Sequence, residues 1–136
     1  PETGEIVLHG LGVSHDVGTA VNPQSVVGQF EGGTSYGMGL ALFEDCCVKE
    51  GKAEAHDFAN YILSTPMDAP NIETAIIESG EGAGPFGARG IGEAANNTSA
   101  AAIVNAVSKA IGVRVTSLPI TPEKVLFALR EQIWPS

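Results

Sequence analysis

The glycine-rich stretch from Gly80 to Asn97, GEGAGPFGARGIGEAANN, most constrains what this chain can fold into. It contains six glycines, one proline and two glutamates, and an apolar helical pattern follows it directly. Such a density of glycine marks a loop whose backbone takes turns that a side chain would block, or lies close against another group. Glu93 is the only carboxylate between Ala83 and Ser117. We therefore take Glu93 as the leading candidate for a functional side chain.

The composition is that of one globular domain covering residues 1–136, with 43% hydrophobic residues and a net charge of −9. This acidic balance argues against nucleic-acid binding, which requires a basic surface. The longest apolar run is far too short to cross a membrane. The only two cysteines, Cys46 and Cys47, are adjacent and neighbours rarely form a disulfide, so we expect a reducing, cytoplasmic location.

Helix and strand signals alternate along the chain and predict an α+β fold, with about three helices packed on one side of a mixed sheet. Asn22 before Pro23 and Thr121 before Pro122 are typical helix starts, and Gly112 is a typical helix end. Predicted helices run from residue 23 to about 44, from 97 or 98 to 111, and from 122 toward the C-terminus. Predicted strands cover residues 5–15, a hairpin from 42 to about 58 with its turn at 50–52, 72–79 and 113–116.

The first predicted helix contains five glycines, several of them four residues apart, such as Gly28 and Gly32. They form a stripe that allows another backbone, or a flat ligand, to approach closely. For any single glycine, packing against another element is the more common reason. At the end of the preceding strand, His15 and Asp16 are expected to order a turn rather than to catalyse a reaction.

Gly82, Gly84 and Gly87 match the GxGxxG pattern of dinucleotide-binding loops. We do not favour that interpretation, because Pro85 and the later glycines prevent a helix from opening inside the motif. The next predicted strand, moreover, ends without an acidic residue for the ribose. The loop instead delivers Glu93 to the start of a helix. From the residues alone, Glu93 is either a general base or a cap of that helix, with capping slightly favoured.

Three runs of the chain resemble one known family, in the same order and over nearly the whole length. They are HDVGTAVNPQSVVGQFEGGTSYGMGLALFE, NYILSTPMDAPNIE and GPFGARGIGEAANNTSAAAIVNAVSKAIGVRVTSLPITPEKVLFAL. The family is the molybdenum-binding large subunit of xanthine dehydrogenases, aldehyde oxidases and aerobic carbon monoxide dehydrogenases, and the chain resembles its C-terminal part. The run GPFGARGIGE is the most specific of these motifs.

The resemblance implies a molybdopterin cofactor, for which the cytosine dinucleotide form is one candidate, and hydroxylation of an aldehyde or N-heterocycle carbon with water. Glu93 then corresponds to a general base that deprotonates the metal-bound hydroxyl. Gln29 corresponds to a pterin contact, Gly28 and Gly32 to the helix stripe against which the cofactor lies, and Gly92 to a position beside the metal. No side chain of this chain is expected to be a metal ligand.

The resemblance also implies partners: the remainder of the large subunit, and iron–sulfur and flavin (FAD) subunits or domains that carry electrons away. The opening Pro-Glu-Thr-Gly reads as a turn with nothing before it, so we expect a fragment or split subunit, inactive alone and able to self-associate. The Ala94-Ala95-Asn96 sequence departs from what often follows the family glutamate, which leaves the substrate open. The alternative function is a non-catalytic interaction or assembly module.

Overall fold

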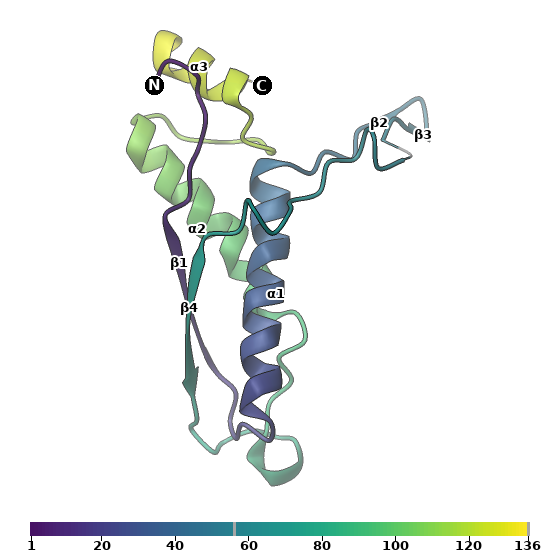
Figure 1. Ribbon diagram of the computed structural model, residues 1–136, viewed down its shortest axis with the longest axis vertical. Helices are drawn as coiled ribbons and strands as arrows, with labels where there is room; N and C mark the ends of the chain where they lie inside the picture. Colours follow the sequence, from purple (N-terminus) through teal and green to yellow (C-terminus); the bar gives the residue numbers. More distant parts are fainter. Residues whose placement is uncertain (56, 136) are drawn as a thin grey trace. The chain divides into compact units, whose positions relative to one another are not determined.

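The computed structural model describes residues 1–55 and 57–135, in which the chain divides into two compact units. The unit that we call the glycine-loop unit comprises Leu8–Gly37 and Ala69–Ser99. The helical unit comprises Pro1–Val7, Met38–Asp68 and Ala100–Ser136. Two long helices, α1 (Pro23–Leu42) and α2 (Ala94–Ile111), each contribute residues to both units (Figure 1).

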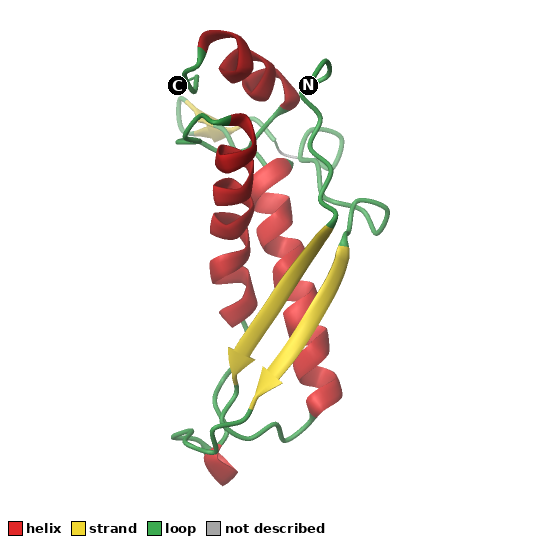
Figure 2. Cartoon of the chain, turned by 90° about the vertical axis from the view of Figure 1, so that its left-hand side faces the viewer, coloured by secondary structure: helices red, strands yellow, loops and turns green. Residues whose placement is uncertain are grey.

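In the glycine-loop unit, β1 (Gly10–Asp16) pairs with β4 (Asn71–Ile77) in parallel, so that Gly10 lies opposite Asn71 and Asp16 opposite Ile77. Figure 2 shows the two strands side by side and pointing the same way. Alternate residues of both strands are partly buried, as expected for a sheet with one covered face. Because the strands run in parallel, their carboxyl ends and the loops that follow them meet at one edge.

The core of this unit combines residues from the end of β1, from α1 and from the start of α2. Its fully buried members are Val17, Val26, Phe30 and Ala95. Partly buried hydrophobic residues pack against them: Val13, Ala20, Ile76 and Ile91. The His15 ring lies 5.8 Å from the Phe30 ring, which assigns this histidine to packing. The predicted cap of α1 is confirmed, because the Asn22 side chain accepts a hydrogen bond from the Ser25 N–H at 3.1 Å.

The helical unit contains the short antiparallel hairpin β2 (Val48–Lys49) and β3 (Lys52–Ala53). Its turn residues Glu50 and Gly51 both have positive φ, the geometry that suits a two-residue hairpin turn. Helix α3 (Pro122–Glu131) begins as predicted, with the Thr121 hydroxyl accepting from the Lys124 N–H at 3.3 Å. Helix α2 ends at the predicted Gly112, whose φ is +73°.

The α+β prediction with three helices is confirmed, and several details of the strands are corrected. The strands within the described residues form two separate two-stranded sheets rather than one mixed sheet. The predicted strand at 113–116 is wrong: Val113 and Val115 are buried, but the Val115 N–H bonds to the Ser108 hydroxyl and not to a neighbouring strand.

Other boundaries shift by a few residues. The first strand begins at Gly10 instead of residue 5, and α2 begins at Ala94, three residues earlier than predicted. The hairpin is much shorter than predicted, since Leu42 still belongs to α1. None of the helices in the described part of the chain has the length and apolar character needed to cross a bilayer.

The packing of α1 against the start of α2 predicts opposite effects for two glycine substitutions in the same helix. A Cβ at Gly33 would lie 2.9 Å from the Ala95 Cβ and 3.0 Å from the Asn96 N, whereas a Cβ at Gly28 meets nothing within 4 Å. We expect Gly33→Ala to lower the free energy of unfolding by about 1 kcal/mol, because overpacking outweighs the gain in helix propensity. Gly28→Ala should raise it by roughly 0.5–1 kcal/mol. Urea denaturation of both variants measures this, and equal effects would contradict the packing argument.

Candidate functional site

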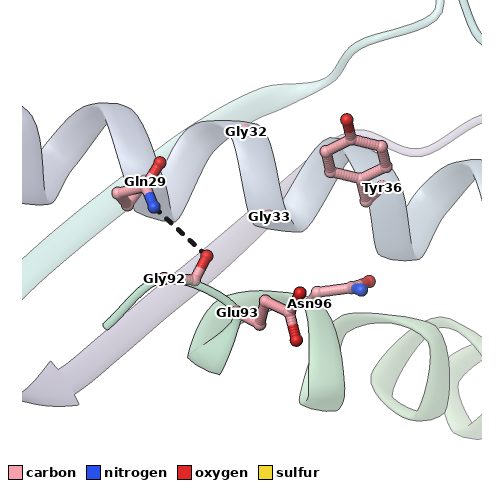
Figure 3. Close-up of a pocket in the computed structure, with 7 residues that line it drawn as sticks. All are labelled: Gln29, Gly32, Gly33, Tyr36, Gly92, Glu93 and Asn96. Atoms are coloured by element: carbon pink, nitrogen blue, oxygen red, sulfur yellow. Dashed lines mark hydrogen bonds between the residues drawn. The ribbon is translucent and has the colours of Figure 1, made fainter. Parts of the chain in front are cut away.

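A pocket of about 310 Å³ lies between α1 and the start of α2 within the glycine-loop unit (Figure 3). Helix α1 contributes Gln29, Gly32, Gly33 and Tyr36. The segment that opens α2 contributes Gly92, Glu93 and Asn96. Four of the five residues predicted for the site from the sequence therefore line one cavity, namely Gln29, Gly32, Gly92 and Glu93. Gly28 is exposed on α1 and does not line this pocket.

One hydrogen bond joins the two walls of the pocket. The Gln29 Nε2 donates to the Gly92 carbonyl oxygen at 3.2 Å, as the dashed line in Figure 3 shows. Gln29 therefore holds the residue immediately before Glu93 at a fixed place relative to α1. This bond leaves the Gln29 Oε1 and its second amide hydrogen available to a ligand.

Bare backbone forms much of the pocket surface. A Cβ at Gly32 would meet nothing within 4 Å, and one at Gly92 would meet only the Gln29 amide nitrogen, at 4.0 Å. The space beside Gly33, by contrast, is already occupied by Ala95 and Asn96 of α2. The glycine stripe of α1 thus has two uses: Gly33 allows the helices to approach, and Gly32 leaves open space in which a flat group can lie against the helix.

Glu93 is exposed and directly precedes the first residue of α2. Its backbone carbonyl oxygen accepts a hydrogen bond from the Asn96 N–H at 3.2 Å. Within residues 1–55 and 57–135 its carboxylate accepts no hydrogen bond and forms no ion pair, so it does not cap the helix through its side chain. Figure 3 shows this side chain extending from the α2 side of the pocket. The carboxylate is free to meet a ligand.

Sequence reasoning missed Asn96 and Tyr36. The Asn96 Oδ1 is buried without a hydrogen-bond partner among the described residues, whereas Tyr36 is 68% exposed on the α1 wall. Their spacing carried a signal, because Asn96 follows Glu93 by three residues and Tyr36 follows Gly32 by four. Residues at these spacings share one face of a helix.

The glycine loop preceding this pocket is folded tightly on itself and against the turn after β1. It contains the 3-10 turn η1 (Pro85–Gly87), in which Phe86 has a φ of +57°. The Gly82 N–H donates to the Gly87 carbonyl oxygen at 2.9 Å, and the Gly80 N–H to that of Gly18, also at 2.9 Å. A Cβ at Gly18 would lie 2.1 Å from the Gly87 oxygen, so the turn and the loop touch backbone to backbone.

Asp16 joins the same turn and loop through its side chain. Its Oδ1 accepts hydrogen bonds from the Gly18 N–H at 2.9 Å and from the Ser79 hydroxyl at 2.9 Å, and its Oδ2 lies 3.3 Å from the Arg89 Nη2. The expectation that Asp16 orders a turn is confirmed. The Gly18 N–H is the largest cause that lowers the pKa of Asp16, followed by the Ser79 hydroxyl, and the Arg89 charge lowers it further.

The chain is similar to a known domain family and to several known proteins. Residues 1–70 match the molybdopterin cofactor-binding domain family. The xanthine dehydrogenase molybdenum-binding subunit of Escherichia coli O157:H7 is 37% identical over 113 residues, which is 82% of this chain and 15% of that protein. The 6-hydroxypseudooxynicotine dehydrogenase complex subunit gamma of Paenarthrobacter nicotinovorans is 33% identical over 129 residues, or 92% of this chain and 16% of that protein.

A solved structure shares the fold. The aldehyde oxidoreductase from Desulfovibrio gigas superimposes with a TM-score of 0.85 at 34% identity, covering 95% of this chain and 14% of that one. This agreement supports the α+β fold of the chain. In each of these three comparisons, the chain covers only about a sixth of the other protein's length.

The hydrogen bonds to Asp16 predict an acid-sensitive fold. Because its pKa is lowered in the folded chain, ionised Asp16 stabilises the fold above the unfolded-state value of about 3.9, and this stabilisation is lost as the pH falls through the folded-state pKa. The free energy of unfolding should therefore decrease on acidification below about pH 5. Asp16→Asn should show a smaller decrease than the parent chain in urea denaturation at several pH values. Identical pH dependence of the two proteins would contradict this assignment.

Proposed function

We propose, because the chain belongs to the molybdopterin cofactor-binding domain family, that it forms part of the cofactor site of a molybdenum hydroxylase. The reaction would be hydroxylation of a carbon of an aldehyde or N-heterocycle with water. The observation that carries the proposal is the pocket in which Gln29, Gly92 and Glu93 meet. The proposed domain covers residues 1–136 and corresponds to the C-terminal part of a large subunit.

The pocket residues fit a flat, phosphorylated cofactor. The bare backbone at Gly32 and Gly92 provides a surface on which a planar ring system can lie, and Gln29 provides amide hydrogen-bonding groups beside it. Gly28, one turn before Gly32, would extend this surface along α1. No lysine or arginine lines the pocket among the described residues, so anionic groups would be held by backbone N–H groups and the N-terminus of α2. The cytosine dinucleotide form is one candidate for such a cofactor.

Glu93 would act as the general base. In the net reaction a carbon–hydrogen bond is replaced by a carbon–oxygen bond, the oxygen comes from water, and two protons and two electrons leave. The bound molybdenum cofactor supplies the acceptor for the two electrons. The Glu93 carboxylate, which no group in the described chain engages, would take a proton from the water-derived nucleophile and later release it to solvent.

The electrons would leave through partners. One of the relatives is named as a subunit of a dehydrogenase complex and another as a molybdenum-binding subunit, which supports the participation of further chains. We propose iron–sulfur and flavin (FAD) subunits or domains as these partners, and the rest of a large subunit as the source of the remaining pocket walls.

A non-catalytic interaction module is the second candidate, and exposed apolar side chains favour it. Phe58 is 84% exposed, Met67 93% and Phe86 88%. Exposed apolar side chains mark a surface that contacts another chain where they form a contiguous patch. The two candidates differ in what Glu93 does, since an interaction module has no need of its carboxylate.

Glu93→Gln tests the catalytic proposal. The amide keeps the size of the side chain but cannot take a proton, so turnover should fall by at least about 10²–10⁴-fold, the typical contribution of a general base. The variant should be assayed with the rest of a family large subunit supplied, under substrate saturation and normalised to bound molybdenum.

Glu31→Gln is the matched control, because Glu31 is an exposed carboxylate of α1 that does not line the pocket. It should keep parental turnover. Near-normal turnover of Glu93→Gln, with an unchanged molybdenum content, would favour the interaction module instead.

The isolated chain should bind little or no molybdenum cofactor, because only α1 and the start of α2 wall the pocket and one side is open to solvent. Metal analysis and pterin fluorescence of the purified chain measure this directly. Stoichiometric molybdenum together with dye reduction by an aldehyde or purine would show that the chain is sufficient by itself.

A further inference from the structure

The geometry points to Asp16 as a positioning residue that, through Arg89, fixes the segment carrying Gly92 and Glu93 into the pocket. This inference rests on the proposed function of Glu93. Asp16 does not line the pocket and is not a catalytic residue. It lies at the carboxyl end of β1, and its side chain is bonded to residues that follow β4 and the glycine loop.

Asp16 holds both ends of the loop that runs from Ser79 to Arg89. Its Oδ1 accepts from the Ser79 N–H at 3.2 Å as well as from the Ser79 hydroxyl and Gly18, so it binds the start of the loop. Its Oδ2 faces the Arg89 guanidinium at 3.3 Å, so it also binds the end of the loop. One carboxylate therefore contacts both Ser79 and Arg89, which are ten residues apart in the chain.

Arg89 is also held through its backbone. The Arg89 N–H donates to the Val17 carbonyl oxygen at 2.9 Å, directly beside Asp16 in the chain. The Arg89 Nη2 also donates to the Glu81 carbonyl oxygen at 3.4 Å. Main chain and side chain of Arg89 are thus both held to the turn after β1, and only three residues separate Arg89 from Glu93.

The three residues between Arg89 and Glu93 differ in how they are held. Gly90 has nothing within 4 Å of a Cβ position and offers no side chain to hold the backbone, whereas Ile91 packs against the core and the Gly92 oxygen is bonded to Gln29. The place of Glu93 is therefore set by three supports: Asp16 with Arg89, the Ile91 side chain, and Gln29. Without the Asp16 carboxylate, the Arg89 side chain is no longer held to β1, and the segment that carries Glu93 depends on the Arg89 N–H bond to Val17, the Ile91 packing and the Gln29 bond.

Three variants remove the contacts of Asp16 to different extents. Asp16→Ala removes every hydrogen bond of the Asp16 side chain and its ion pair with Arg89. Asp16→Asn keeps an oxygen that can accept from Gly18 and Ser79 but removes the charge that faces Arg89. Arg89→Gln removes the positive partner of the same ion pair. Asp68→Asn is the matched control: the Asp68 carboxylate accepts from the Thr65 N–H and hydroxyl, both at 2.7 Å, in the helical unit.

We expect Asp16→Ala to lower kcat by about 10²-fold per bound molybdenum, the cost of a misplacement of roughly 1 Å, with KM changed less than about twofold. Asp16→Asn and Arg89→Gln should each give a smaller loss, and their combination less than the sum of the two losses, because both break the same ion pair. Independently of activity, hydrogen exchange of the amides from Gly80 to Gly92 should become at least about tenfold faster in Asp16→Ala and stay unchanged in Asp68→Asn, since opening of this loop would then be local.

The assays use the chain with the rest of a family large subunit supplied, with Glu93→Gln measured in parallel. Loss of activity that merely follows loss of molybdenum or of folded protein, with kcat per molybdenum unchanged, would overturn the positioning role. So would parental kcat and parental hydrogen exchange in all three variants while Glu93→Gln is inactive. An active Glu93→Gln enzyme would instead overturn the proposed function, and with it the role given to Asp16.

Discussion

The close contact between α1 and the start of α2 at Gly33 is the constraint on which the pocket depends. The space that a Cβ would take there is already occupied by the Ala95 methyl group and the Asn96 backbone. Because the two elements approach so closely, the short Gln29 side chain can reach the Gly92 carbonyl oxygen, and Glu93 is delivered beside Gly32. A larger residue at position 33 would separate the two walls, and the hydrogen bond between them would be lost.

Glycine serves two distinct purposes in this unit, and the structure separates them. At Gly18 and Gly33 the absent side chain permits backbone contact with another segment, and at Gly32 and Gly92 it leaves open space beside the carboxylate. In the sequence all four positions are glycine, so the two purposes cannot be told apart there. Only the neighbours of each glycine reveal whether its bare surface is used for packing or remains available to a ligand.

Much of the fold and site follows from local signals, and the remainder depends on long-range contacts. Asn22, Thr121 and Gly112 marked helix ends correctly because capping is a local interaction. The stretch at 113–116 resembles a strand in the sequence because valines alternate with polar residues. In the structure the valines are buried, but among the described residues this stretch does not pair with a strand. Asn96 and Tyr36 escaped notice because only the approach of α1 and α2 places them at the same pocket.

The acidity of the chain and the chemistry of the pocket are connected. With 7 basic against 16 acidic residues, the chain has few cations to offer an anionic ligand, and Arg89 is already paired with Asp16. The pocket offers uncharged side-chain donors from Gln29, Tyr36 and Asn96, and Gly32 and Gly92 leave bare backbone beside them. The N–H groups of Gly80, Gly82, Gly84 and Gly87 already donate to carbonyl oxygens of the loop and of Gly18. The glycine loop therefore supports the pocket and does not itself supply donors to it. The proposed general base, Glu93, is thus the one carboxylate among the residues that line the pocket, and it lies beside bare backbone without an ion pair in the described part of the chain.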